Sequence, residues 1–265
     1  MIDKVSVVVP VYNSGHFLEE TIQSVKNQTY ANIELIVVDN CSTDEFTIKV
    51  LENLKDEFEL VVSTQKGLSI ARNDGIQKAS GKYILPLDSD DIIQPTFIEK
   101  CVEKFNSSPN VKVVRTQVEL FGKKKGTIVF APYSLSILLA RNLMVATSMF
   151  TKESWNAVGG YDSNLTICFE DWEFWINLLK DGGDVSTVDE PLFRYRIRKK
   201  SMMHSLNLDN LMAARKLIWE KHKALYAKHY MNPVESFEYK FMEDSKANKL
   251  GNLILAPFSS LKLMQ

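Results

Sequence analysis

Several hallmarks of other protein classes are missing from this chain of 265 residues. It has no run of 18 apolar residues, so we expect nothing to span a bilayer, and its first residues lack a signal-peptide pattern. Cysteine is limited to Cys41, Cys101 and Cys168, an odd number without the spacing of metal ligands. These features favour reduced thiols and a cytoplasmic protein.

A preponderance of one charge sign is missing as well. The 32 Lys and Arg residues and the 33 Asp and Glu residues leave a net charge of -1, which argues against electrostatic capture of nucleic acid. The glycine-rich motifs of dinucleotide-binding and Walker-type proteins are also absent. With 45% hydrophobic residues, the chain can still form one large domain or two small ones.

Apolar and amphipathic segments alternate through the first 90 residues. The runs at Val5–Val11 and Ile33–Val38 are rich in β-branched residues, as expected for strands that are buried on both faces. Shorter strands are predicted at 60–63 and 83–87, with helices between the strands. This alternation predicts an α/β fold with an open, mostly parallel sheet and helices on both faces. Ligands of such sheets bind beyond the carboxyl ends of the strands, where Asp39 and Asp88 lie.

The second half of the chain has a different pattern. It predicts a hairpin at 111–120 and 127–130, helices at 134–145 and about 171–180, and short strands at 185–188 and 192–197. From Leu208 onward the sequence is typical of amphipathic helices rich in lysine. We interpret residues 1–205 as one compact domain and residues 206–265 as a helical C-terminal extension. That extension could lie on a membrane, or it could pack on the domain or on another subunit.

Three aspartates, Asp88, Asp90 and Asp91, crowd into four positions after the predicted strand at 83–87. Like charges this close raise one another's pKa unless a cation offsets them. Mg²⁺ and Mn²⁺ bind oxygen ligands, and they often use one or two carboxylates together with substrate phosphates. The Asp-x-Asp pair therefore favours a site for a divalent cation. Asp91 is interpreted as the cap of the following helix.

Six segments, VSVVVPVYN, IELIVVDNCSTD, GLSIARNDGI, GKYILPLDSDD, GGYD and EDWEFW, occur in this order. Together they resemble glycosyltransferase family 2, whose members are inverting enzymes with the GT-A fold, over roughly residues 4–202. The resemblance implies that a sugar is transferred from a nucleotide-sugar, expected to be a UDP-sugar. The acceptor would be a hydroxyl of a saccharide or lipid-linked saccharide, and the process would be polysaccharide biosynthesis. It also implies a nucleotide-binding half at 1–100, an acceptor-side half at 101–205, and a place in the cytoplasm or at the inner face of the membrane.

The resemblance further implies roles for individual residues. Asp90 would bind Mn²⁺ or Mg²⁺ directly, and Asp88 would contact metal-bound water or the ribose. The residues expected to bind the nucleotide-sugar are Pro10, Tyr12, Asn13, Asp39, Arg72, Asp88, Ser89 and Arg198. Asp39 would accept the imide N–H of uracil, although it could instead cap a turn. Tyr12 could equally belong to the core, and Arg72 could equally form a surface ion pair.

Arg198 stands where the family often has a histidine that reaches the metal. An arginine at this position could contact phosphate directly as a fixed cation. His204 is the alternative ligand. The third protein ligand of the metal is therefore left open.

The pair Glu170 and Asp171 opens the predicted helix at 171–180. Acidic residues favour a helix N-terminus electrostatically, but the resemblance places the general base here. Inverting transfer needs one carboxylate to take the proton from the acceptor hydroxyl. We expect Asp171 to be that base and Glu170 to contact donor or acceptor hydroxyls. Trp172 and Trp175 could form a sugar-stacking wall or belong to the core.

Two other functional classes are compatible with parts of this pattern. A nucleotidyltransferase also needs paired aspartates at a strand end, but it usually has a glycine-rich loop after its first strand, which PVYNSGHF does not provide. A non-catalytic sugar-binding relative of the same fold is the other alternative. The presence of Asp39, Asp88, Asp90 and Asp171 together argues against it.

Overall fold

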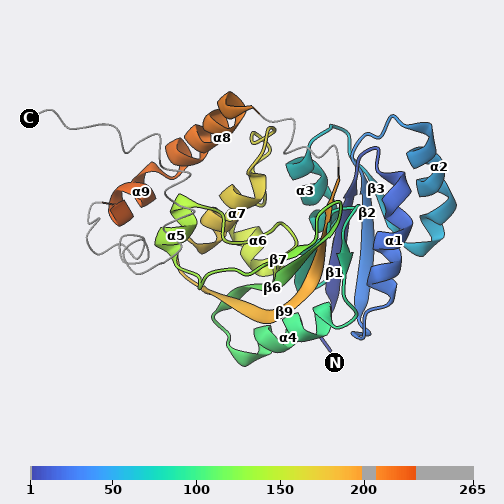
Figure 1. The fold of residues 1–265 in the computed structure, drawn as a ribbon, viewed down its shortest axis with the longest axis horizontal. Coiled ribbons are helices and arrows are strands. Elements are labelled where there is room, and N and C mark those ends of the chain that lie inside the picture. The colour runs from blue at the N-terminus through green and yellow to red at the C-terminus, as the bar shows by residue number, and fades with distance from the viewer. Residues whose placement is uncertain (1, 199–206, 231–265) are drawn as a thin grey trace, which may run out of the picture.

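The computed structural model describes residues 2–198 and 207–230, which form one mixed sheet covered by helices (Figure 1). The strands are β1 (Val5–Val11), β2 (Ile33–Asp39), β3 (Glu59–Val62), β4 (Tyr83–Pro86), β5 (Ile92–Ile93), β6 (Val111–Gly122), β7 (Gly126–Ile128), β8 (Met149–Thr151) and β9 (Asp184–Ile197). The helices are α1 (Gly15–Lys26), α2 (Glu45–Leu54), α3 (Leu68–Lys78), α4 (Phe97–Ser107), α5 (Leu135–Ala140), α6 (Lys152–Val158), α7 (Glu170–Leu179), α8 (Leu208–Lys221) and α9 (Lys223–Tyr230), with a 3-10 turn at Lys55–Glu57.

The strand order is β3-β2-β1-β4-β8-β6-β9-β5, and β7 pairs with β6. Strands β3, β2, β1 and β4 run parallel, as the alternating pattern predicts. Beyond β4 the sheet becomes mixed, because β8 runs antiparallel to both β4 and β6. The parallel register sets Val11 opposite Asp39, so the first polar residues after β1 and β2 meet at one edge.

Helices cover both faces of the sheet and bury two apolar layers. On β1, Val7 and Val9 face the layer that contains α1, α2 and α4, whereas Val8 faces the layer that contains α3, α5 and α7. This follows from the two-residue period of a strand. Helix α3 approaches the sheet closely at Gly75, where an added Cβ would lie 2.5 Å from Cγ1 of Val8. A glycine is therefore required for α3 to reach this depth.

Two predictions about local structure are wrong, and a third is correct in position but misses that two predicted strands are continuous. The helix predicted at 134–145 ends at Ala140, because the buried guanidinium of Arg115 holds the Leu143 carbonyl and draws the chain into an extended loop. The strands predicted at 185–188 and 192–197 are parts of the continuous strand β9. Asp91 is not a helix cap: Thr96 precedes α4, and Asp91 is buried.

The first part of the C-terminal extension packs on the domain. On α8, Ala214 and Ile218 are buried, and Ile218 joins the apolar layer that contains α7. Within the part of the chain that the structure describes, no helix is both long and apolar enough to cross a bilayer.

Candidate active site

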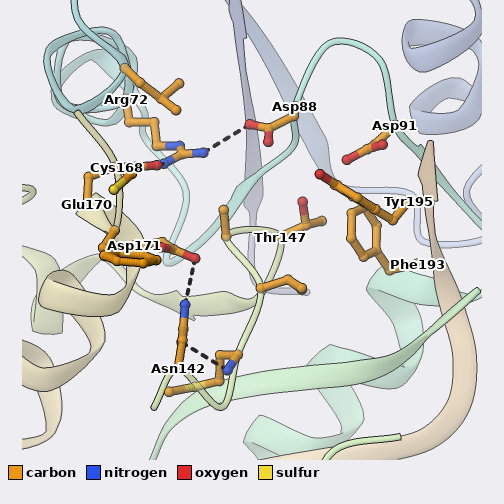
Figure 2. Close-up of a pocket in the computed structure, with 15 residues that line it drawn as sticks. Arg72, Asp88, Asp91, Asn142, Thr147, Cys168, Glu170, Asp171, Phe193 and Tyr195 are labelled. Carbon is orange, nitrogen blue, oxygen red and sulfur yellow. Dashed lines mark hydrogen bonds and ion pairs between the residues drawn. The ribbon is translucent and has the colours of Figure 1, made fainter. Parts of the chain in front are cut away.

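A pocket of about 300 Å³ opens beyond the carboxyl end of β4, between α3, the loop after α5 and the start of α7 (Figure 2). Its polar wall includes Arg72, Asp88, Asp91, Asn142, Thr147, Cys168, Glu170, Asp171 and Tyr195. Apolar side chains, among them Leu68, Met144, Val145 and Phe193, form the rest. The pocket therefore joins the segment that carries the aspartate cluster to the segment that carries the predicted base.

Arg72 links two walls of this pocket. Its side chain is only 1% exposed, since α3 lies deep against the sheet. Nη1 donates to Oε1 of Glu170 at 2.7 Å, and Nη2 donates to Oδ1 of Asp88 at 3.0 Å. Burial alone would lower the pKa of Arg72, but the two carboxylates outweigh it and raise that pKa. Arg72 is thus a fixed cation between the aspartate cluster and the first turn of α7.

Asp171 lies on the first turn of α7 and faces the pocket (Figure 2). The turn is entered through Phe169, which adopts the left-handed conformation with φ 64°. Oδ1 of Asp171 accepts the Trp172 backbone N–H at 2.7 Å, and Oδ2 accepts Nδ2 of Asn142 at 2.9 Å. Burial and the adjacent Glu170 raise the pKa of Asp171 to about 7, against the opposing effects of Arg72 and the two hydrogen bonds. Such a carboxyl can exchange a proton near neutral pH.

The aspartate cluster is partly neutralised by two arginines at the end of β9, Arg196 and Arg198. Nε of Arg198 lies 2.8 Å from Oδ2 of Asp90, and the Arg196 backbone N–H donates to Oδ1 of Asp91 at 2.7 Å. Burial and repulsion from Asp88 nevertheless raise the pKa of Asp90, and burial raises that of Asp91 still further. The two arginines therefore do not fully compensate the carboxylates, and a cation bound beside them would favour their ionised forms.

The predicted nucleotide-binding residues lie at the neighbouring ends of β1 and β2. Oδ1 of Asp39 accepts the Ser42 N–H at 2.9 Å, and Oδ1 of Asn13 accepts the Thr43 N–H at 2.8 Å. The Asn13 contact ties the loop after β1 to the loop after β2, and the Asp39 contact closes the turn that follows β2. Nζ of Lys66 lies 3.8 Å from the ring centroid of Tyr12, which is 37% exposed and thus not a core residue.

Pro10 and Ser89 complete this edge. Pro10 lies in β1 beyond Val8, the last residue paired with β4, so its missing N–H disturbs no ladder on that side. Oγ of Ser89 lies 2.6 Å from Oγ of Ser14, a contact that joins the aspartate segment to α1. Pro10 and Ser89 thus shape the strand and the loop at this edge and do not line the pocket itself.

Some predicted residues lie elsewhere. Trp172 and Trp175 are 3% and 0% exposed, so of the two alternatives for these residues the core holds and the sugar-stacking wall does not. His204 lies outside the described residues. Across 2–198 and 207–230, no group of three His, Cys, Asp or Glu side chains is arranged to hold a metal ion.

Four polar residues of the pocket were not predicted from the sequence, namely Asn142, Thr147, Cys168 and Tyr195. Asn142 was expected inside a helix, where its contact with Asp171 could not be anticipated. Tyr195 of β9 lines the pocket opposite α7, and burial together with the aspartate cluster raises its pKa to about 12. Its phenol is therefore a neutral hydrogen-bonding group at physiological pH.

Comparisons with known proteins agree with this architecture. The family model described as Glycosyl transferase family 2 matches residues 6–151. The Bacillus subtilis protein TuaG, named for teichuronic acid biosynthesis, is 28% identical over 242 residues, which are 88% of this chain and 92% of that protein.

Two solved structures have the same fold. S. aureus TarS 1-349 in complex with UDP-GlcNAc matches with a TM-score of 0.72 at 20% identity, over 98% of this chain and 76% of that chain. The mannosyltransferase PcManGT from Pyrobaculum calidifontis, in complex with GDP-Man and Mn²⁺, matches with a TM-score of 0.63 at 18% identity, over 99% and 82%. These likenesses confirm the predicted GT-A fold class.

Proposed function

The chain belongs to glycosyltransferase family 2 and is a glycosyltransferase; on that premise we propose that it transfers a sugar with inversion from a UDP-sugar to an acceptor hydroxyl. The observation that carries the proposal is one pocket in which Asp88, Arg72 and Asp171 converge. Family membership also sets aside the nucleotidyltransferase and the non-catalytic binding module. A saccharide or lipid-linked saccharide is the proposed acceptor, which accords with the name of TuaG.

Asp171 is the proposed general base. It takes the proton from the acceptor hydroxyl as that oxygen attacks the anomeric carbon, on the face opposite the departing diphosphate. A pKa of about 7 suits this role, because about half of the base is then ionised at neutral pH and the ionised form is still basic enough to accept a proton. Glu170, oriented by Arg72, is proposed to contact sugar hydroxyls.

Asp90 and Asp88 are the proposed ligands of Mn²⁺ or Mg²⁺. The raised pKa of Asp90, caused by burial and by Asp88, fits a site whose charge a cation would offset. Two carboxylates suffice for such ions when the substrate diphosphate supplies further oxygens. When bound, the ion would stabilise negative charge on the departing diphosphate. Arg198 neutralises part of the charge of Asp90 in this structure, and we propose that its guanidinium contacts the phosphates of the donor when the donor is bound.

The edge formed by β1 and β2 is the proposed site for the nucleoside. Asp39 would accept the imide N–H of uracil, while Pro10, Tyr12, Asn13 and Ser89 would complete the contacts to the nucleotide. The TarS complexes with UDP-GlcNAc and with UDP support uridine as the base. This choice of donor is a proposal for the present chain.

We propose that residues 206–265 form a C-terminal extension to a catalytic domain at 1–205, which has halves at 1–100 and 101–205. On α8, Leu208, Met212 and Trp219 are exposed along one side, with Lys216 and Lys223 beside them. The combination of apolar and basic side chains suits an anionic lipid surface at the cytoplasmic face of a membrane. Co-sedimentation with phosphatidylglycerol vesicles tests this contact, and self-association of the helices is the opposing outcome.

Replacement of Asp171 by Asn tests the central proposal. A thermal-shift screen of UDP-, GDP- and CMP-linked sugars with Mn²⁺ first identifies the donor. The D171N variant should bind that donor with an unchanged Kd and lose transfer by about 10²- to 10⁴-fold. Asp181→Asn, the same change at the exposed far end of α7, is the matched control. Retained turnover in D171N would contradict the assignment of the base.

A further inference from the structure

The side chain of Asn142 has a defined orientation beside Asp171 (Figure 2). Its Oδ1 accepts the Met144 backbone N–H at 3.1 Å, and its Nδ2 donates to Oδ2 of Asp171 at 2.9 Å. A flipped amide would place Nδ2 against an N–H group and Oδ1 against a carboxylate oxygen. Both contacts would then be repulsive, so the network fixes the assignment of the two amide atoms.

The loop that carries Asn142 is itself held in place. Arg115, which is 1% exposed, donates to the Leu143 carbonyl through Nη1 and to Oγ1 of Thr187 through Nε. These bonds anchor residue 143 to β6 and β9, on the side of the pocket opposite α7. Asn142 therefore contacts Asp171 from a rigid support.

We propose that Asn142 is a positioning residue, which holds the Asp171 carboxylate in orientation for proton removal by donating a hydrogen bond to Oδ2. The inference rests on the proposed role of Asp171 as the base. Together with the Trp172 N–H on Oδ1, this bond fixes the rotation of the carboxylate. Each oxygen keeps a second lone pair, and that of Oδ2 is available to an acceptor hydroxyl in the pocket.

The same bond favours the ionised form of Asp171. A donor to a carboxylate stabilises the charged state, and here it offsets burial and the charge of Glu170. The other ionisable groups around Asp171 are Arg72 on α3, Tyr161 and Cys168 before α7, and Glu170 on α7 itself. Among them Arg72 alone is cationic, and it is already shared by Asp88 and Glu170. Asn142 thus supplies a hydrogen-bond donor to Asp171 that, unlike the guanidinium of Arg72, is not shared with other carboxylates.

The matched substitution is Asn142→Asp. A carboxylate at this position retains the shape and the acceptor for the Met144 N–H, but it replaces the donor facing Asp171 with an acceptor and a like charge. Asn142→Ala removes the donor without adding charge. Asn156→Asp, an exposed position on α6, carries the same charge change away from the pocket and is the control.

The measurement is a ¹³C NMR titration of the Asp171 carboxyl in the free enzyme, assigned by its disappearance in D171N. The midpoint should rise by about one pH unit or more in N142D and less in N142A, and it should stay in place in N156D. The acidic limb of kcat/KM against pH should move by the same amount, with activity recovered at higher pH. Thermal melts first establish that N142D and N142A fold. A titration midpoint that is unchanged or lowered in both of them would overturn the inference.

The outcome is separable from that of the proposed function. If D171N retains turnover, the base is another residue, whatever Asn142 does. If D171N is inactive while N142D and N142A titrate like the wild type, Asp171 remains the base and the inference about Asn142 fails.

Discussion

Nη1 of Arg72 lies 2.7 Å from Oε1 of Glu170, although 98 positions separate the two residues in the chain. The same guanidinium reaches Asp88 through Nη2. A single buried cation therefore connects the end of β4, where we propose that the metal and diphosphate bind, to the first turn of α7, where we propose that the base lies. Any movement of one wall relative to the other must rearrange this bridge.

Arg72→Gln should be among the most destabilising single changes in the described chain. It removes the cation between two carboxylates while leaving both in place, and loss of one partner from a buried pair costs about 3–5 kcal/mol of unfolding free energy. Arg72→Lys should rescue this only in part, because a single ammonium cannot make the forked contact. Arg194→Gln, which breaks the half-exposed pair with Glu119, should cost about 0–1 kcal/mol. Equal urea midpoints for R72Q and R194Q would refute the bridge.

The pH dependence of stability should have a definite sign. The pKa values of Asp90, Asp91 and Asp171 are all raised in the folded protein, chiefly by burial. The folded state therefore holds more protons than the unfolded chain, and the free energy of unfolding should fall as pH rises from about 4 to about 7. Urea titrations at several pH values measure this slope. A rise in stability over this range would contradict the assigned protonation states.

Binding of Mn²⁺ with UDP should restore the stability that the protein loses as pH rises. At higher pH the Asp90 carboxyl is ionised and can bind the cation, so the thermal midpoint should increase with ligand concentration. Near pH 5 the increase should be smaller, because protons compete for the same oxygens. EDTA should abolish the increase, and so should Asp90→Asn, whereas the exposed Asp56→Asn should behave as the wild type. A shift that persists in D90N would place the metal elsewhere.

The parallel half of the fold could be predicted from sequence because its signals are local. The β-branched runs at Val5–Val11 and Ile33–Val38 mark buried strands whatever the rest of the chain does. The polar residues that follow each strand necessarily meet at the same edge of a parallel sheet. The positions of Asp39 and Asp88 therefore follow from the sequence pattern, whereas that of Glu170 follows only from the resemblance to the family.

The burial of Arg72 and the position of Asn142 could not be predicted in this way. Arg72 is buried because Gly75 admits α3 against Val8 and because Glu170 arrives from a distant segment. Asn142 lies outside the predicted helix because the guanidinium of Arg115 binds the carbonyl of the next residue, Leu143. Both effects depend on contacts between remote parts of the chain, which periodicity does not record.

Asp39 should determine the preference for uracil. The carboxylate accepts an N–H that uracil has and cytosine lacks, and a hydrogen bond to a charged group contributes about 1.5–3 kcal/mol. Asp39→Asn can still accept the Ser42 N–H, so the loop should keep its shape. We expect UDP affinity to fall roughly 10- to 100-fold, with a smaller change for CDP, measured by calorimetry with Mn²⁺. Glu45→Gln, exposed on the adjacent α2, is the control, and equal losses for both nucleotides would contradict base recognition.

Glu173 should couple the C-terminal helices to the proposed catalytic helix. Its side chain is fully buried on α7, and Oε1 lies 2.8 Å from Nε2 of His222 and 2.9 Å from Nζ of Lys221. Glu173→Ala leaves His222 without its carboxylate and leaves Lys221 paired with Asp162 alone, and we expect a loss of roughly 3 kcal/mol in unfolding free energy. Backbone amides of α8 should exchange hydrogen faster than in Glu153→Ala, an exposed change on α6. Since Glu173 follows Asp171 by half a turn, a looser contact between α7 and α8 should also reduce sugar transfer. Unchanged hydrogen exchange in α8 would show that the buried Ala214 and Ile218 hold the helix without Glu173.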